Sequence, residues 1–168
     1  MQTGNPGHLP TVDYLGLQRY SLTFCTFERR RLFVHGAHVD MVLSQILRAA
    51  GENQFVVLAY CFMPDHLHLL VEGQADGSDC KRFIKLAKQY SGFYFKRAAG
   101  EPLWKRYGFE RVLRNAEQTL VVAKYIVENP VRAGLVQRAE DYRFIGSMAY
   151  PLPVLIAGAA KGLDHRSV

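Results

Sequence analysis

At 168 residues, with 49% hydrophobic and 21% charged side chains, the chain has the length and composition of one globular domain, which excludes a disordered protein except at the ends. Lysine and arginine outnumber aspartate and glutamate by 21 to 15, and an isoelectric point near 9.3 favours a polyanionic partner. The three cysteines form no C-x-x-C pair, so neither a disulfide framework nor a zinc ribbon is predicted. A reducing cytoplasm fits this cysteine usage best. No apolar segment reaches the ~20 residues of a spanning helix, so a soluble cytosolic protein is expected.

The periodicities predict elements in the order β-α-β-β-α-β-α. Runs of β-branched and aromatic residues predict strands, and apolar residues three and four apart predict helices. In chain order we expect a strand over Arg19–Phe27, a helix over Gly36–Gly51 stopped by Gly51, a buried strand over Gln54–Phe62, a turn at Met63–Asp65, a strand over His66–Gly73, a helix from about Asp79 to Arg97, a strand over Tyr107–Arg114, and a helix from Ala116 ended by Pro130.

These elements predict an α+β fold with a ferredoxin-like (RRM-like) antiparallel sheet and helices packed mainly on one face. We find no internal repeat and no linker. The whole chain, residues 1–168, is therefore interpreted as a single domain, with loose ends at about 1–16 and 161–168, where glycine, proline and polar residues gather.

Two histidines separated by one leucine lie in the second strand of the predicted hairpin. Side chains alternate along a strand, so His66 and His68 point the same way, roughly 6–7 Å apart along the chain, while Leu67 faces the other side. Both imidazoles could hold one divalent ion. An isolated H-x-H is more often hydrogen-bonded at a sheet surface, and two ligands alone make a poor metal site, so a third ligand must come from elsewhere.

A tyrosine with polar neighbours lies on the last predicted helix. Asn115 is a candidate N-cap, and at about 100° per residue Tyr125 and Asn129 share one helix face with Gln118. A structural role, with the ring in the core, is the commoner one for such a tyrosine. The alternative nucleophiles, Tyr90 and Tyr94, belong to an apolar stripe that predicts packing.

Cations that could contact phosphates occur at several places in the chain. Lys81, Lys85 and Lys88 form one stripe of their helix, although such a run is more often a solvated face. Further candidates are Arg29, Arg30, Arg31, Arg111 and Arg114.

Three segments in this order and spacing, YCFMPDHLHLLVEG, LWKRYGFERVLR and YIVENPVRAGLV, resemble the REP-associated tyrosine transposases of the single-tyrosine HUH transposase superfamily. The resemblance extends from about Tyr14 to Tyr150. It implies a ferredoxin-like sheet, a divalent metal, Mg²⁺ or Mn²⁺, and cleavage of single-stranded DNA.

Carried over by motif, His66 and His68 resemble the HUH metal ligands, Tyr125 the catalytic nucleophile, and Asn129 the further metal ligand. The insertion-sequence branch of the superfamily typically has Gln at that last position, whereas Asn-Pro resembles the REP-associated branch.

The implied activity is transposition or endonuclease cleavage, in which Tyr125 attacks a phosphate polarised by the metal and forms a 5′-phosphotyrosine, and the strand is later rejoined. Hairpin or repetitive extragenic DNA is the implied substrate, and a homodimer is an open alternative for its assembly. Two other readings stay open. One is a catalytically silent protein that binds hairpin DNA. The other is a metal-dependent hydrolase of a small phosphoester.

Overall fold

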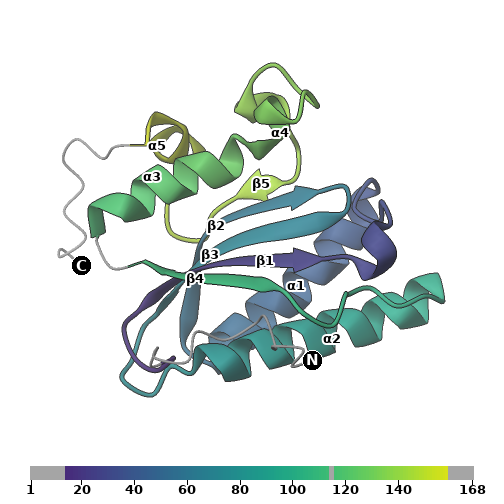
Figure 1. The fold of residues 1–168 in the computed structure, drawn as a ribbon, viewed down its shortest axis with the longest axis horizontal. Coiled ribbons are helices and arrows are strands. Elements are labelled where there is room, and N and C mark those ends of the chain that lie inside the picture. The colour runs from purple at the N-terminus through teal and green to yellow at the C-terminus, as the bar shows by residue number, and fades with distance from the viewer. Residues whose placement is uncertain (1–13, 114–115, 159–168) are drawn as a thin grey trace, which may run out of the picture.

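A five-stranded antiparallel sheet lies between two layers of helices (Figure 1) in the computed structural model, which describes residues 14–113 and 116–158. In sheet order the strands are β4 (Phe109–Leu113), β1 (Arg19–Cys25), β3 (His66–Gly73), β2 (Phe55–Met63) and β5 (Ile145–Gly146). The helices are α1 (Gly36–Glu52), α2 (Cys80–Ala99), α3 (Ala116–Val127), α4 (Asn129–Arg132) and α5 (Leu152–Ala157). The predicted order β-α-β-β-α-β-α is confirmed as far as α3.

Alternate side chains of β3 are buried on opposite faces of the sheet. Leu67, Leu69 and Val71 belong to the core that contains α1 and α2, whereas Leu70 belongs to a second core with α3 and α5. Because side chains alternate along a strand, His66 and His68 share the face of Leu70. The histidine pair therefore lies on the face of the sheet that α3 covers.

The α+β, antiparallel fold class is confirmed, with one addition to the expected layering. The long helices α1 and α2 cover one face, as expected, but α3 packs on β2 and β3 from the opposite side. The reason lies in β2, whose run Val57–Cys61 is buried except for part of Tyr60. A strand that is apolar on both faces needs cover on both.

Several boundaries differ from the predicted ones. Helix α1 passes through Gly51 and ends at Glu52, one residue later than predicted, because the side-chain amide of the C-cap Asn53 donates to the Ala49 carbonyl at 2.7 Å and closes the helix there. The two-residue strand β5 and the helix α5 were not predicted, since both are shorter than a periodicity can reveal.

The predicted loose N-terminal end is wrong for residues 14–16. Tyr14 is buried and stacks on Tyr20 at 5.9 Å, and its carbonyl accepts the backbone N–H of Cys80. Residues 1–13 and 159–168, which contain the rest of both predicted ends, lie outside the described residues. Across the described ranges, the helices are too short or too polar to cross a lipid bilayer.

Candidate active site on the α3 face of the sheet

The two histidines of β3 meet at their Nε2 atoms, which lie 3.0 Å apart. The ring centroids are 4.7 Å apart and the planes are nearly perpendicular, so the rings converge edge to face instead of stacking. The antiparallel hairpin of β2 and β3 fixes this arrangement, because His66 pairs with Met63 and His68 with Cys61 in the middle of the sheet. The predicted common direction of the two side chains is thus observed.

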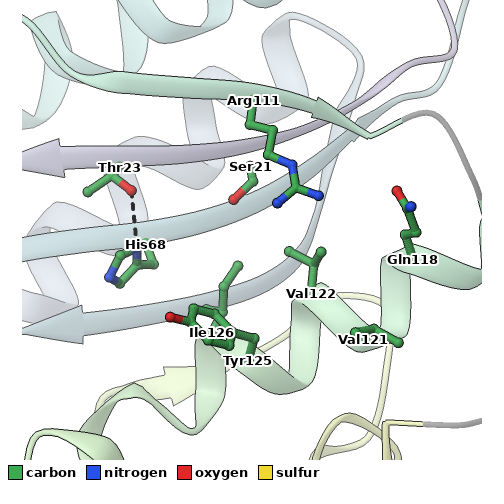
Figure 2. Close-up of a pocket in the computed structure, with 9 residues that line it drawn as sticks. All are labelled: Ser21, Thr23, His68, Arg111, Gln118, Val121, Val122, Tyr125 and Ile126. Atoms are coloured by element: carbon green, nitrogen blue, oxygen red, sulfur yellow. Dashed lines mark hydrogen bonds between the residues drawn. The ribbon is translucent and has the colours of Figure 1, made fainter.

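Each imidazole also has an oxygen partner on its far side. His66 Nδ1 lies 2.7 Å from a carboxylate oxygen of Asp65, and His68 Nδ1 lies 3.1 Å from the hydroxyl of Thr23 on the neighbouring strand β1 (Figure 2). When both Nδ1 atoms donate to these oxygens, both Nε2 atoms present lone pairs to one point, which a proton or a cation must occupy. Outer oxygen partners of this kind orient metal-binding histidines.

The electrostatics favour a neutral, ligand-competent His68. Burial first, and then the nearby positive charges of His66, Arg132 and Arg29, lower the pKa of His68 to about 4. Although burial acts to raise the pKa of Asp65, its hydrogen bonds to His66 and Arg29 hold that pKa below the usual value. Asp65 is therefore ionised at neutral pH and paired with Arg29, whose Nε lies 2.9 Å away.

The donor set fits a divalent cation in part. Two convergent Nε2 atoms with outer oxygen partners are a suitable pair of ligands. No cluster of three or more His, Cys, Asp or Glu side chains that could hold a metal occurs within residues 14–113 and 116–158. The remaining positions would have to come from an amide oxygen, water or a substrate phosphate.

Tyr125 projects from α3 into the same pocket as His68 (Figure 2). The pocket is a cavity of about 570 Å³ between the sheet and α3, with Gln118, Val122 and Ile126 along the helix side. The Tyr125 side chain is 61% exposed, so a ligand can reach its hydroxyl. The structure thus brings together Tyr125 and His68, which are 57 positions apart in the sequence.

Asn129 lies just beyond the end of α3, and the predicted continuous helix is wrong here. Helix α3 ends at Val127, Glu128 is a turn residue, and Asn129 begins α4. Pro130 has no N–H to donate to the Ile126 carbonyl, and the side-chain amide of Asn129 donates to that carbonyl instead, at 3.1 Å. Its nitrogen is therefore engaged, and only its oxygen could act as a ligand.

The cations predicted to contact DNA fall in different places. Arg111 of β4 lines the pocket opposite α3 (Figure 2). Lys81, Lys85 and Lys88 lie on α2, in the helix layer on the other face of the sheet (Figure 1). Arg114, and the predicted N-cap Asn115, lie outside the described residues.

The alternative nucleophiles are also on α2, away from the pocket. Tyr90 donates its hydroxyl to Glu52 at 2.7 Å and stacks under Arg48, which agrees with the predicted packing role. Tyr94 is 39% exposed and packs edge to face on Phe93.

Three polar residues of the site escaped the sequence analysis. The sequence predicts Asp65 only as a turn residue, although its position directly before His66 is a signal that it could orient the imidazole. Thr23 reaches His68 through the β1–β3 register, which no local pattern reveals. Arg132 stacks on Tyr125 only because the helix breaks between them.

The chain is similar in sequence and in fold to known proteins. A family model described as "Transposase IS200 like" matches residues 15–129. The chain is 31% identical over 109 residues to the REP-associated tyrosine transposase of Escherichia coli (strain K12). That match covers 62% of this chain and 62% of the relative, which is less than two thirds of the relative's length.

A solved structure shares the fold. It is a REP-associated tyrosine transposase bound to a REP hairpin, with a TM-score of 0.69 and 21% identity, and the match covers 82% of this chain and 81% of that one. The predicted resemblance to this group is confirmed. Because the matched segment spans more than half of the sequence and contains His66, His68, Tyr125 and Asn129, the chain belongs to the IS200-like transposase family.

Proposed function

We propose that this protein is a metal-dependent transposase that cleaves and rejoins single-stranded DNA through a 5′-phosphotyrosine. The observation that carries the proposal is the meeting of two imidazole Nε2 atoms, 3.0 Å apart, beside a pocket that Tyr125 also lines. Family membership supports the same activity.

The three cysteines, all of them free, support the proposed location in a reducing cytoplasm.

The bonds that form and break can be written for Tyr125. Its phenolic oxygen attacks the scissile phosphorus and the bond between phosphorus and the 3′-oxygen breaks. The phosphate stays on the 5′-oxygen of the downstream strand, which is now joined to the tyrosine, and the upstream strand leaves with a 3′-hydroxyl. The phenol loses a proton and the departing 3′-oxygen gains one. Attack by a 3′-hydroxyl on the phosphotyrosine reverses the exchange, joins DNA and restores the phenol, so no nucleotide cofactor is consumed.

His66 and His68 would hold the divalent cation, Mg²⁺ or Mn²⁺, with Asn129 as the proposed further ligand. When bound, this cation supplies Lewis-acid polarisation of the scissile phosphate. Asp65 and Thr23 keep the two rings in their convergent orientation. Arg111, across the pocket from Tyr125, offers a positive charge to the phosphates of an entering strand.

The proposed substrate is hairpin or repetitive extragenic DNA, by analogy with the REP hairpin in the related structure. Arg111 would contact DNA close to the pocket, and Arg114, which lies outside the described residues, is proposed as a further DNA contact. Lys81, Lys85 and Lys88 would contact DNA that extends around the sheet to α2, because the sheet separates them from the pocket.

The decisive experiment compares Tyr125→Phe with the wild-type protein on single-stranded hairpin DNA in Mn²⁺ or Mg²⁺. We expect the wild type to form a covalent protein–DNA adduct, detected on a denaturing gel, and the Phe variant to form none. Tyr94→Phe, which removes a hydroxyl from the other layer, is the matched control and should behave as wild type. An adduct with Tyr125→Phe would assign the nucleophile elsewhere.

Two further outcomes separate the alternatives. Hairpin binding by the wild type without any adduct would indicate a catalytically silent DNA-binding protein. Turnover of small phosphoesters without a trapped adduct would indicate a hydrolase. His66→Ala should abolish cleavage, and unchanged cleavage would remove the role of the metal.

A further inference from the structure

A single arginine holds Tyr125 from two directions. The guanidinium carbon of Arg132 lies 3.7 Å from the centroid of the Tyr125 ring, within the range of a close cation–π contact. One of its terminal N–H groups also donates to the backbone carbonyl of Tyr125. The same side chain therefore contacts both the ring and the main chain of the proposed nucleophile.

This contact depends on the break between α3 and α4. In a continuous α-helix, Arg132 would lie seven residues, or about 10 Å, further along the axis than Tyr125. Instead the chain turns at Glu128, α4 starts at Asn129, and the N–H of Arg132 donates to the Glu128 carbonyl at 3.1 Å. The turn shortens the separation, and the arginine folds back onto the tyrosine ring.

Most of the guanidinium remains available for a ligand. Of its five N–H donors, one is used by the Tyr125 carbonyl, and within the described part of the chain no carboxylate forms an ion pair with Arg132. Arg29, Arg48 and Arg138, in contrast, each pair with an acidic side chain. Arg132 is exposed, and the ring that it covers lines the pocket with His68.

We propose that Arg132 is a positioning residue for strand cleavage: its guanidinium plane fixes the Tyr125 ring, and its free N–H edge binds a phosphate of the strand that enters the pocket. The inference rests on the proposed function, because it assigns a DNA strand to the pocket and the attack to Tyr125. A planar guanidinium can stack on a ring and bind a phosphate at the same time, which a lysine ammonium cannot do equally well.

The two roles can be separated with Arg132→Gln and Arg132→Lys. DNA affinity is measured by fluorescence anisotropy at several salt concentrations. All variants in this assay also carry Tyr125→Phe, so that the protein binds the DNA without cleaving it. We expect Arg132→Gln to reduce the slope of log affinity against log salt by about 1, the loss of one phosphate contact. Arg132→Lys, which keeps the charge, should restore the slope.

The rate of adduct formation is then measured at saturating DNA with Tyr125 intact. Arg132→Gln and Arg132→Lys should both slow this step by about 10²-fold, because a misplaced reacting group costs that much even when the substrate is bound. Arg138→Gln, which removes a charge paired with Asp141 in the next segment, is the matched control and should change neither rate nor slope. Thermal unfolding checks that each variant is folded, and Arg132→Met replaces any variant that is not.

The outcomes distinguish this inference from the function on which it rests. If the wild type forms an adduct on Tyr125 and the folded Arg132 variants match it in rate and salt slope, the role of Arg132 is wrong and the proposed function stands. If Arg132→Lys restores the full rate as well as the slope, charge alone suffices and the positioning role is wrong. A wild type that forms no adduct overturns both.

Discussion

Each imidazole of the site is held by one oxygen. Asp65 lies 2.7 Å from His66 Nδ1 and is itself fixed by Arg29, while Thr23 lies 3.1 Å from His68 Nδ1. Removing such an outer partner lets the ring rotate and lowers the basicity of the nitrogen that faces the metal. The strength of metal binding should therefore depend on residues that never touch the ion.

We predict that Asp65→Asn weakens Mn²⁺ binding by about 10- to 100-fold, the usual effect of losing an outer-shell carboxylate. Isothermal titration of the DNA-free protein measures this directly. Asp141→Asn removes a surface carboxylate that pairs with Arg138, and it should leave Mn²⁺ affinity unchanged. Equal affinities for wild type and Asp65→Asn would show that Asp65 does not support the ligand.

Asn129 has a structural contact and a predicted ligand role that use different atoms. Its nitrogen donates to the Ile126 carbonyl, so Asn129→Asp loses that donor but keeps a side-chain oxygen. We predict that Asn129→Asp lowers the free energy of unfolding by about 1 kcal/mol yet keeps its affinity for Mn²⁺. Asn129→Leu should lower both the free energy of unfolding and the affinity for Mn²⁺. Wild-type Mn²⁺ affinity in the Leu variant would exclude Asn129 as a ligand.

At the scale of elements, the sequence was informative where one segment decides its own structure. The alternation around His66 and the helical spacing around Val39 predicted β3 and α1 within a residue or two. The sequence places the end of the helix at Pro130, which is too late: α3 ends at Val127, and Pro130 lies in the first turn of α4, where proline is tolerated. The contacts of Thr23 and Arg132 depend on strand register and on this break, which are not local properties.

The edge formed by β5 is secured by a tyrosine that precedes it. Tyr142 donates its hydroxyl to the Phe62 carbonyl of β2 at 2.7 Å. We predict that Tyr142→Phe lowers the free energy of unfolding at pH 7 by about 1 kcal/mol, the net value of one such bond. Chemical denaturation measures it, with Tyr94→Phe as a control that has no effect.

The stability difference between the wild type and Tyr142→Phe should also depend on pH. Burial raises the pKa of Tyr142 to about 12, above the ~10 of a free phenol. As the pH rises, the unfolded chain therefore loses this proton before the folded protein does. The contribution of Tyr142 to the free energy of unfolding is complete below about pH 10 and is lost as the pH rises through the pKa of the folded protein. The stability difference between wild type and Tyr142→Phe should shrink between about pH 10 and pH 12. A constant difference across that interval would contradict this assignment.

In the whole molecule, the proposed chemistry and the basic helix occupy opposite faces of one sheet. His68, Tyr125 and Arg111 line the pocket on the α3 side, whereas α2 carries six lysines and arginines and no acidic residue on the other side. A DNA molecule that contacts both must pass around an edge of the sheet. The edge strand β4, which carries Arg111, is the nearest route between them.

This separation predicts different effects for cations on the two faces. Lys81→Gln with Lys85→Gln should lower the slope of log affinity against log salt by about 2, one for each phosphate contact, while the adduct rate at saturating DNA stays unchanged. Arg111→Gln should lower the salt slope by about 1 and also slow the adduct step, because Arg111 lines the pocket. Both Lys81 and Lys85 are exposed, so their replacement leaves the core intact. If the lysine pair slows the adduct step at saturating DNA, then α2 takes part in forming the reactive complex, and the assignment of affinity to one face and chemistry to the other is wrong.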